Sequence, residues 1–239
     1  MNSSLQYILY YAHEQGDKVY TMTAKVNELA PELQVASWVQ GSPVTLAGLR
    51  GQVVLVEVFQ VNCPGCFIQA LPEAVRLHDL YEDQGLVVIG IATAFEDYEK
   101  NTLENLQQLL DSGKLAAEPF KALQQRGELV EGRLRWKIPF AVAMDEIVKD
   151  EEPVTEQKIL KYAQRLYPDM QQRRAEEQGY IMKMMQRHLE QKTMTARTFE
   201  SYDLKGTPSS ILIDREGILR EVAFGPQEDL ESMIRTYLG

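Results

Sequence analysis

The stretch from Val53 to Cys66 constrains the fold more than any other part of the chain. It opens with an apolar run rich in β-branched side chains, which is typical of a strand buried on both faces. Both cysteines, Cys63 and Cys66, come shortly after this run, and apolar residues at helical spacing continue from Phe67 to about Tyr81. We therefore predict a dithiol at the junction between a buried strand and a helix.

A thiol at a helix N-terminus is acidic, because backbone N–H groups and the helix dipole stabilise the thiolate. In such CxxC pairs the pKa falls from roughly 8.5 to about 3.5–7.5. Cys63 comes first and is predicted to be the more exposed thiol and the nucleophile, while Cys66 resolves the mixed disulfide. Pro64 and Gly65 between them carry no charge, and Pro64 has no N–H to offer Cys63. The alternative is a static disulfide or two inert buried thiols.

A second apolar run, 86–92, follows the helix and predicts a parallel βαβ unit. Beyond this unit we expect short strands at 33–38 and 44–46, and mostly helix over 96–137 with a break at 112–113. Pro72 is expected to kink the first helix. The other expected elements are a helix at 4–14, strands around 19–22 and at 138–144, charged helices over 151–201, strands at 209–213 and 218–223 joined by a turn, and a closing helix after 226.

Composition excludes some classes of protein. The chain has 239 residues, 44% hydrophobic and 25% charged, as expected of a globular protein, and its net charge of −10 argues against nucleic acid as a partner. No apolar run approaches the roughly 20 residues that span a bilayer. The first residues lack a basic region and a long apolar core, so they do not predict a secretory signal. We therefore expect a cytoplasmic protein, or a periplasmic one if a signal sequence was removed.

Three groups of residues together resemble the TlpA/redoxin-type reductases of the thioredoxin superfamily. Cys63-Pro64-Gly65-Cys66 follows a buried strand within a βαβ unit, which is the thioredoxin-like signature. Residues 30–33 and 46–56 resemble the opening of that family. Gly206-Thr207-Pro208, followed by 211–217, resembles its cis-proline segment and the hairpin after it.

The resemblance implies an α/β thioredoxin-like fold, with a central mixed β-sheet flanked by helices. It covers residues 30–95 and 199–239 well, and 138–145 in between. We expect residues 1–29 to form an N-terminal extension. Residues 30–239 then form the thioredoxin-like domain, with an inserted helical subdomain at about 146–198.

Glu57 interrupts the buried strand, so its carboxyl group is predicted to be buried and its pKa raised. It lies six residues before Cys63, where thioredoxin-like proteins often carry a buried acid, and the resemblance implies that it exchanges a proton with Cys66. The alternative is an edge-strand glutamate that faces solvent. Pro208 is implied to be the cis-proline that presents the backbone of Thr207 to a substrate strand; the alternative is a trans proline.

The chain also departs from the family pattern. Asn62 stands where the family commonly has tryptophan, and Gln60 and Val61 replace the usual residues before it. These positions shape the rim where a substrate disulfide docks, so we count Asn62, together with Pro64, Gly65, Thr207 and Pro208, as candidate substrate-binding residues. A peroxidase is not expected, because Val56 and Gln60 occupy the places of the proline and threonine that precede the peroxidatic cysteine.

The predicted function is thiol–disulfide oxidoreduction, most simply as a protein disulfide reductase. The expected partners are a client protein or small-molecule disulfide and a thiol reductant that recycles the dithiol; no cofactor or metal is expected. One alternative is a non-catalytic scaffold that uses the helical insertion. The other is a zinc or iron–sulfur site formed by paired CxxC motifs across a dimer, because one CxxC with His78 nearby falls short of a metal site.

Overall fold

A computed structural model describes residues 23–239, so the helix predicted at 4–14 and the strand predicted around 19–22 lie outside the described residues. One mixed sheet has the strand order β1-β6-β3-β2-β9-β10. The central pair is β2 (Val53–Phe59) and β3 (Leu86–Ala92), which run parallel as predicted. Every residue of β2 is buried, which explains why all of them except Glu57 are apolar.

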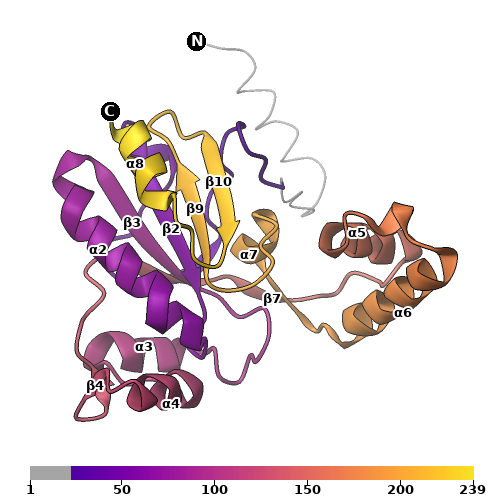
Figure 1. Cartoon of the computed structure of the whole chain (residues 1–239), viewed down its shortest axis with the longest axis horizontal. Helices are drawn as coiled ribbons and strands as arrows, with labels where there is room; N and C mark the ends of the chain where they lie inside the picture. Colours follow the sequence, from indigo (N-terminus) through magenta and orange to yellow (C-terminus); the bar gives the residue numbers. More distant parts are fainter. Residues whose placement is uncertain (1–22) are drawn as a thin grey trace.

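The remaining strands complete a thioredoxin-like sheet and confirm the predicted fold class. β6 is parallel to β3, whereas β1, β9 and β10 are antiparallel to their neighbours. Their bounds are Val35–Gln40 for β1, Ala141–Asp145 for β6, Ser209–Ile213 for β9 and Leu219–Phe224 for β10. Helices cover both faces of the sheet (Figure 1).

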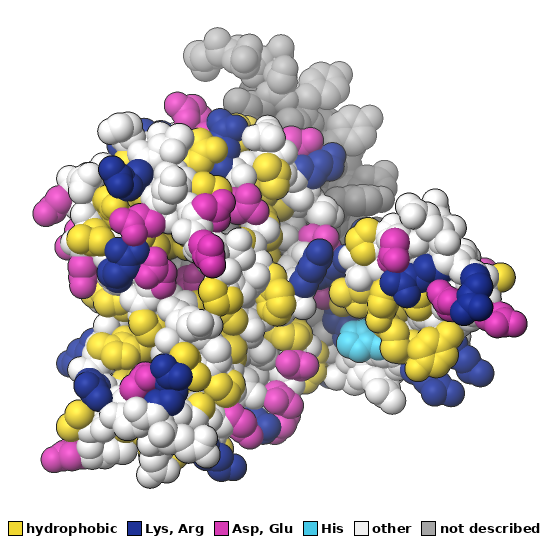
Figure 2. All heavy atoms as spheres, viewed as in Figure 1, with side chains coloured by type: hydrophobic (Ala, Val, Ile, Leu, Met, Phe, Trp, Pro, Cys, Tyr) yellow, Lys and Arg dark blue, Asp and Glu magenta, His cyan; other side chains and the backbone are white. Residues whose placement is uncertain are grey.

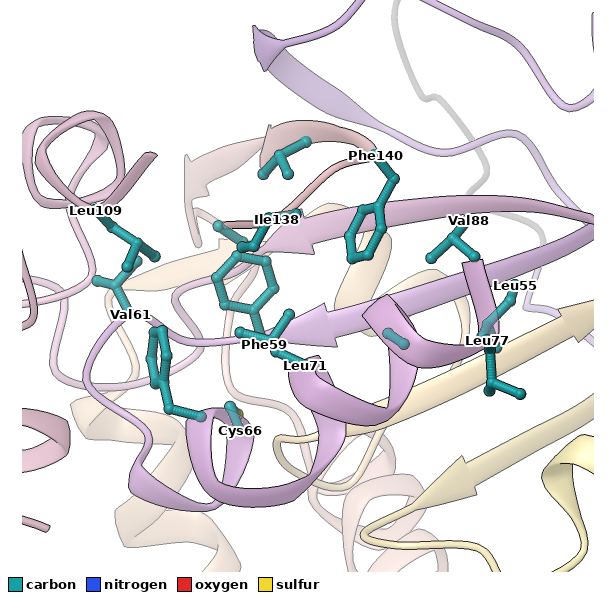
Figure 3. Packing of buried hydrophobic residues seen from close by; sticks show 14 of the residues in the cluster. Leu55, Phe59, Val61, Cys66, Leu71, Leu77, Val88, Leu109, Ile138 and Phe140 are labelled. Carbon is teal, nitrogen blue, oxygen red and sulfur yellow. The ribbon is translucent and has the colours of Figure 1, made fainter. Parts of the chain in front are cut away.

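The two faces of β2 belong to two hydrophobic cores. Leu55 and Phe59 pack with α2 (Leu71–Tyr81) and α8 (Leu230–Leu238), as Figure 3 shows in part. Val54, Val56 and Val58 pack on the other side with α7 (Arg197–Ser201). Because side chains alternate along a strand, Glu57 lies on the α2 face.

The first helix contains a π-helical stretch, Cys66–Ala70, that leads into α2, and Pro72 lies where the two meet. Within that stretch the N–H of Leu71 donates to the carbonyl of Cys66, five residues back. Pro72 has no N–H, and its ring would clash with a carbonyl four residues back in a regular helix. The π turn removes this conflict and leaves Pro72 in the first turn of α2.

Residues 93–137 form two helices and a small hairpin. α3 (Leu103–Ser112) ends at the predicted break, where Gly113 has a φ of 68°. α4 (Ala117–Gln125) follows, and then β4 (Leu129–Val130) pairs with β5 (Arg133–Leu134), a hairpin that the sequence did not predict.

The strand predicted at 44–46 is wrong. This stretch leads instead into a 3-10 helix, Ala47–Leu49. The carboxylate of Glu32 accepts hydrogen bonds from the N–H groups of Leu46 (2.8 Å) and Ala47 (2.7 Å). A side chain thus satisfies backbone donors that a strand would have paired with a neighbour.

A helical arm, residues 147–196, is inserted between β6 and α7. β7 (Ile147–Lys149) and β8 (Met194–Ala196) pair as an antiparallel ribbon at its base. The ribbon carries α5 (Glu156–Leu166), a short 3-10 helix (Met170–Gln172) and α6 (Ala175–Gln191), which project from the sheet in Figure 1. The arm has a hydrophobic cluster of its own, made of Ile159, Ala163, Met170, Ile181, Met185 and Leu189.

Acidic and basic side chains are interspersed over the face shown in Figure 2, where hydrophobic side chains also gather on the arm beside a histidine. Among residues 23–239, no helix has the length and apolar character that crossing a membrane requires.

Candidate active site

The two cysteines lie where β2 gives way to the first helix. Cys63 is half-buried, whereas Cys66 is fully buried and faces the strand near Phe59 (Figure 3). The two form a disulfide, with a Cα–Cα distance of 5.4 Å. The N–H of Cys66 lies 3.2 Å from the Sγ of Cys63, a contact that would stabilise a thiolate in the reduced protein. Cys63 is thus the more exposed of the two cysteines, as predicted, and the order in which they attack stays a prediction.

The cis-proline loop, residues 204–208, passes directly over this pair. The Thr207–Pro208 peptide bond is cis, as predicted. The carbonyl oxygen of Thr207 lies 3.6 Å from the Sγ of Cys63, and Pro208 Cδ lies 3.8 Å from the position a Cβ would take on Gly65. The structure therefore brings four predicted site residues together, from segments about 140 residues apart: Cys63, Gly65, Thr207 and Pro208.

Glu57 lies in the interior beneath this site. Its side chain is 2% exposed on the central strand β2, so the edge-strand alternative is excluded. Burial raises the pKa of Glu57 to about 8, and a hydrogen bond from Ser210 Oγ to Oε2 (2.8 Å) only partly offsets this effect. Oε1 has no hydrogen-bond partner among the described residues. The carboxyl group shares the α2 face of the sheet, and hence a core, with Cys66.

Asn62 does not present its amide to solvent at the rim. Its Nδ2 donates to Asp97 Oδ2 (2.8 Å), and its backbone N–H donates to Asn101 Oδ1 (3.2 Å). Asn101 in turn donates to the carbonyl of Glu96 (3.1 Å). Asn62 therefore orders residues 93–101, the rim loop, against the cysteine motif. Pro64 is partly exposed.

Gln60 is a functional candidate that the sequence reasoning missed. Its side chain is 3% exposed, its Nε2 donates to the carbonyl of Glu96 (3.1 Å), and its Oε1 accepts from Thr207 Oγ1 (3.1 Å). Its own carbonyl accepts the N–H of Cys63 (3.1 Å). The signal available in the sequence was a polar residue placed directly after a fully buried strand.

Asp145, at the end of β6, was also missed. It accepts from Thr93 Oγ1 (2.7 Å) and from the N–H groups of Thr198 (2.8 Å) and Phe199 (3.2 Å), and so caps α7. Burial raises the pKa of Asp145 to about 6, although these three bonds oppose the shift. The carboxyl group thereby holds the helix from which the cis-proline loop departs.

The described side chains around His78 do not resemble a metal-binding site. His78 lies on α2 with its Nε2 3.0 Å from Glu82 Oε2 and its ring against Phe140. The described part of the chain contains no group of three or more histidine, cysteine, aspartate or glutamate side chains arranged to hold a metal ion.

Comparisons with known proteins agree with this geometry. A crystal structure of a thioredoxin-like superfamily protein is similar, with 26% identity and a TM-score of 0.54, over 89% of this chain and 97% of that one. A thiol-disulfide isomerase from Corynebacterium glutamicum is similar with 27% identity and a TM-score of 0.53, over the same shares of 89% and 97%.

In sequence, the chain is 36% identical over 75 residues to Protein DipZ of Mycobacterium tuberculosis and of Mycobacterium bovis. That match covers 30% of this chain and 11% of each DipZ protein. No protein-family model matches the chain. The sheet, the cysteine pair and these structural neighbours together place the chain in the thioredoxin superfamily, with the fold of a thiol-disulfide oxidoreductase.

Proposed function

We propose that the protein is a thioredoxin-like reductase of protein or small-molecule disulfides. One observation carries the proposal: a half-buried Cys63 lies at a helix start, 3.6 Å from the carbonyl of Thr207 in a cis-proline loop, with Cys66 buried behind it. This arrangement leaves one sulfur open to a substrate and shields the other. A purely structural disulfide has no need of a half-buried first cysteine beside a cis-proline loop.

The reaction begins with the reduced dithiol. The Cys63 thiolate attacks one sulfur of the client disulfide and forms a mixed disulfide, and the first client thiolate leaves and takes up a proton. Cys66 then loses its proton to the carboxylate of Glu57 and attacks Cys63 Sγ, which releases the second client thiolate. The client gains two electrons, and Cys63 and Cys66 become a disulfide. A pKa of about 8 suits Glu57 to exchange protons near neutral pH.

The other site residues hold the client. Thr207 presents its backbone beside Cys63, and an extended client segment can pair with it as an added strand. Pro208 fixes the direction of that backbone, Pro64 and Gly65 lie beside Cys63, and Asn62 acts through its hydrogen bonds to Asp97 and Asn101 in the rim loop. A thiol reductant supplies the two electrons that regenerate the dithiol, so the cycle requires no bound cofactor, and we propose the cytoplasm as its compartment.

Dithiothreitol-dependent reduction of insulin tests the proposal. The wild type should accelerate the reaction, and Cys63→Ser should reduce the rate to that of dithiothreitol alone. Equal rates for the two proteins would overturn the proposal and favour a scaffold role for the arm.

Equilibration of the Cys63–Cys66 couple with glutathione gives its reduction potential, which decides whether the protein reduces or oxidises its clients. A reductase has a potential below that of the glutathione pool, and a higher potential would assign the protein as an oxidase or isomerase.

A further inference from the structure

Gln60 joins the three segments that surround the reactive sulfur. Its backbone carbonyl accepts a hydrogen bond from the N–H of Cys63, and its Oε1 accepts one from the hydroxyl of Thr207. Its Nε2 donates to the carbonyl of Glu96 in the rim loop. The side chain is 3% exposed, and both ends of its amide have a partner. An amide is suited to this place because it supplies a donor and an acceptor at once.

The hydrogen bond from Gln60 to the Thr207 side chain is important because the backbone of Thr207 lies next to Cys63. The Thr207 carbonyl is 3.6 Å from Cys63 Sγ, so the side chain of Thr207 is bound to Gln60 while its backbone faces the sulfur. Gln60 thus connects the start of the cysteine motif to the backbone that a client strand would pair with. The hydrogen bond bridges residues 147 positions apart.

We propose that Gln60 is a positioning residue for client recognition, which holds the backbone of Thr207 at a fixed distance from Cys63. The inference rests on the proposed function and adds to it a determinant of specificity for extended polypeptide disulfides. A small disulfide reacts at the sulfur alone and makes no use of Thr207. A polypeptide has to pair with the backbone of Thr207 while its disulfide reaches Cys63, so it depends on the spacing between the two.

The test compares two substrates across one mutant cycle. Thr207→Val removes the hydroxyl group while keeping the shape of the side chain, and Gln60→Met removes both polar groups of the amide. The substrates are a disulfide-bonded extended peptide and 5,5′-dithiobis(2-nitrobenzoic acid), each reduced by the dithiol form of the protein. Thr207→Ser keeps the hydroxyl group and serves as the conservative variant. Gln40→Met is the matched control, because the Gln40 amide is also hydrogen-bonded, through Nε2 to the carbonyls of Ile138 and Phe140, but lies on the edge strand β1.

We expect the second-order rate constant for reduction of the peptide to fall about 3- to 10-fold in Thr207→Val and in Gln60→Met, through weaker binding of the peptide, which is the effect of losing one hydrogen bond. The small disulfide should react within about twofold of the wild-type rate in both variants. The double variant should lose no more than the worse single variant, because both changes break the same bond. Thr207→Ser, which keeps the hydroxyl group, should lose less peptide activity than Thr207→Val, and Gln40→Met should match the wild type.

Equal losses on both substrates would overturn the inference, since Gln60 would then act on the cysteine chemistry or on folding. Unchanged peptide kinetics in Thr207→Val would overturn it as well, even if Gln60→Met failed to fold. A wild type that reduces neither substrate would instead contradict the proposed function, so the two failures are distinguishable.

Discussion

Glu57 shows how one buried group links folding to chemistry. The carboxyl group sits on a central strand opposite Ser210, and its pKa of about 8 lies well above the ordinary value of 4.5 because of burial. Because folding raises the pKa of Glu57, its protonated form contributes to the free energy of unfolding, and this contribution is fully present when the pH is below the pKa of Glu57 in the unfolded chain. That stability is lost as the pH rises through about 8.

Replacing Glu57 with glutamine should therefore change the pH dependence of stability. Glutamine never ionises, so the free energy of unfolding of the wild type should fall relative to Glu57→Gln by about 3 kcal/mol between pH 5 and pH 8. Urea denaturation of both oxidised proteins at several pH values measures the difference. Asp145, whose pKa is also raised, titrates in both proteins and cancels in the comparison. Parallel pH profiles would show that Glu57 does not titrate in this range.

The same carboxyl group should influence Cys66. In a Cys63→Ser background, Glu57→Gln removes a negative charge from the core that surrounds Cys66, so the thiolate should form at lower pH. The pH dependence of iodoacetamide labelling of Cys66 measures this shift. Glu73→Gln, on the outer surface of α2, is the control and should leave the profile unchanged. An identical profile for Glu57→Gln would remove the proton-transfer role.

At the scale of elements, strands and helices whose patterns are local could be predicted, and those that depend on distant partners could not. β2 and β3 and the helix between them follow from hydrophobic periodicity alone. β7 and β8 are three residues each and exist because Ile147 pairs with Ala196 across the arm. α7 is five residues long and is capped by Asp145, more than 50 residues earlier.

The arm is joined to the rest of the molecule by its ribbon and by a few buried charges. Glu200 on α7 accepts from Arg165 (2.9 Å) and Lys192 (2.6 Å). Burial raises the pKa of Glu200, but these two charges together outweigh it and hold the pKa below its ordinary value. The hydrophobic cluster of the arm is separate from the two cores of the sheet. We propose that the arm is a separable insertion and that the thioredoxin-like domain folds without it.

A shortened protein tests this division. An Asn-Gly turn in place of residues 151–192 can close the ribbon, because Asp150 N–H already donates to the carbonyl of Thr193 (2.9 Å). Glu200→Gln accompanies the deletion, since an unpaired buried carboxylate would itself destabilise the domain. Circular dichroism should show a cooperative thermal transition, and reduction of a small disulfide should stay within about twofold of the full chain. Loss of cooperative unfolding would show that the arm is part of one folding unit.

At the scale of the whole molecule, the site is formed by three segments that meet beyond the end of the central strand β2: the cysteine motif, the rim loop and the cis-proline loop. The motif predicted Cys63, Cys66 and Glu57, because a single strand and helix carry them. Pro208 was predicted through its resemblance to a known segment. The hydrogen bond between Gln60 and Thr207 could not be predicted from the sequence, because no sequence pattern around either residue indicates that the two lie close together in the fold.

Trapping of the mixed disulfide tests whether Cys63 attacks the client disulfide and Cys66 resolves the product. Cys66→Ser and Cys63→Ser are each reduced, incubated with a disulfide-bonded peptide, and analysed by intact-protein mass spectrometry. Cys66→Ser should accumulate a covalent adduct of one peptide on Cys63, because no resolving thiol remains, and Cys63→Ser should form an adduct far more slowly, because a peptide reaches the buried Cys66 less readily than a small reagent does. An adduct that forms equally fast on Cys63→Ser, or on neither variant, would show that Cys63 is not the attacking thiol.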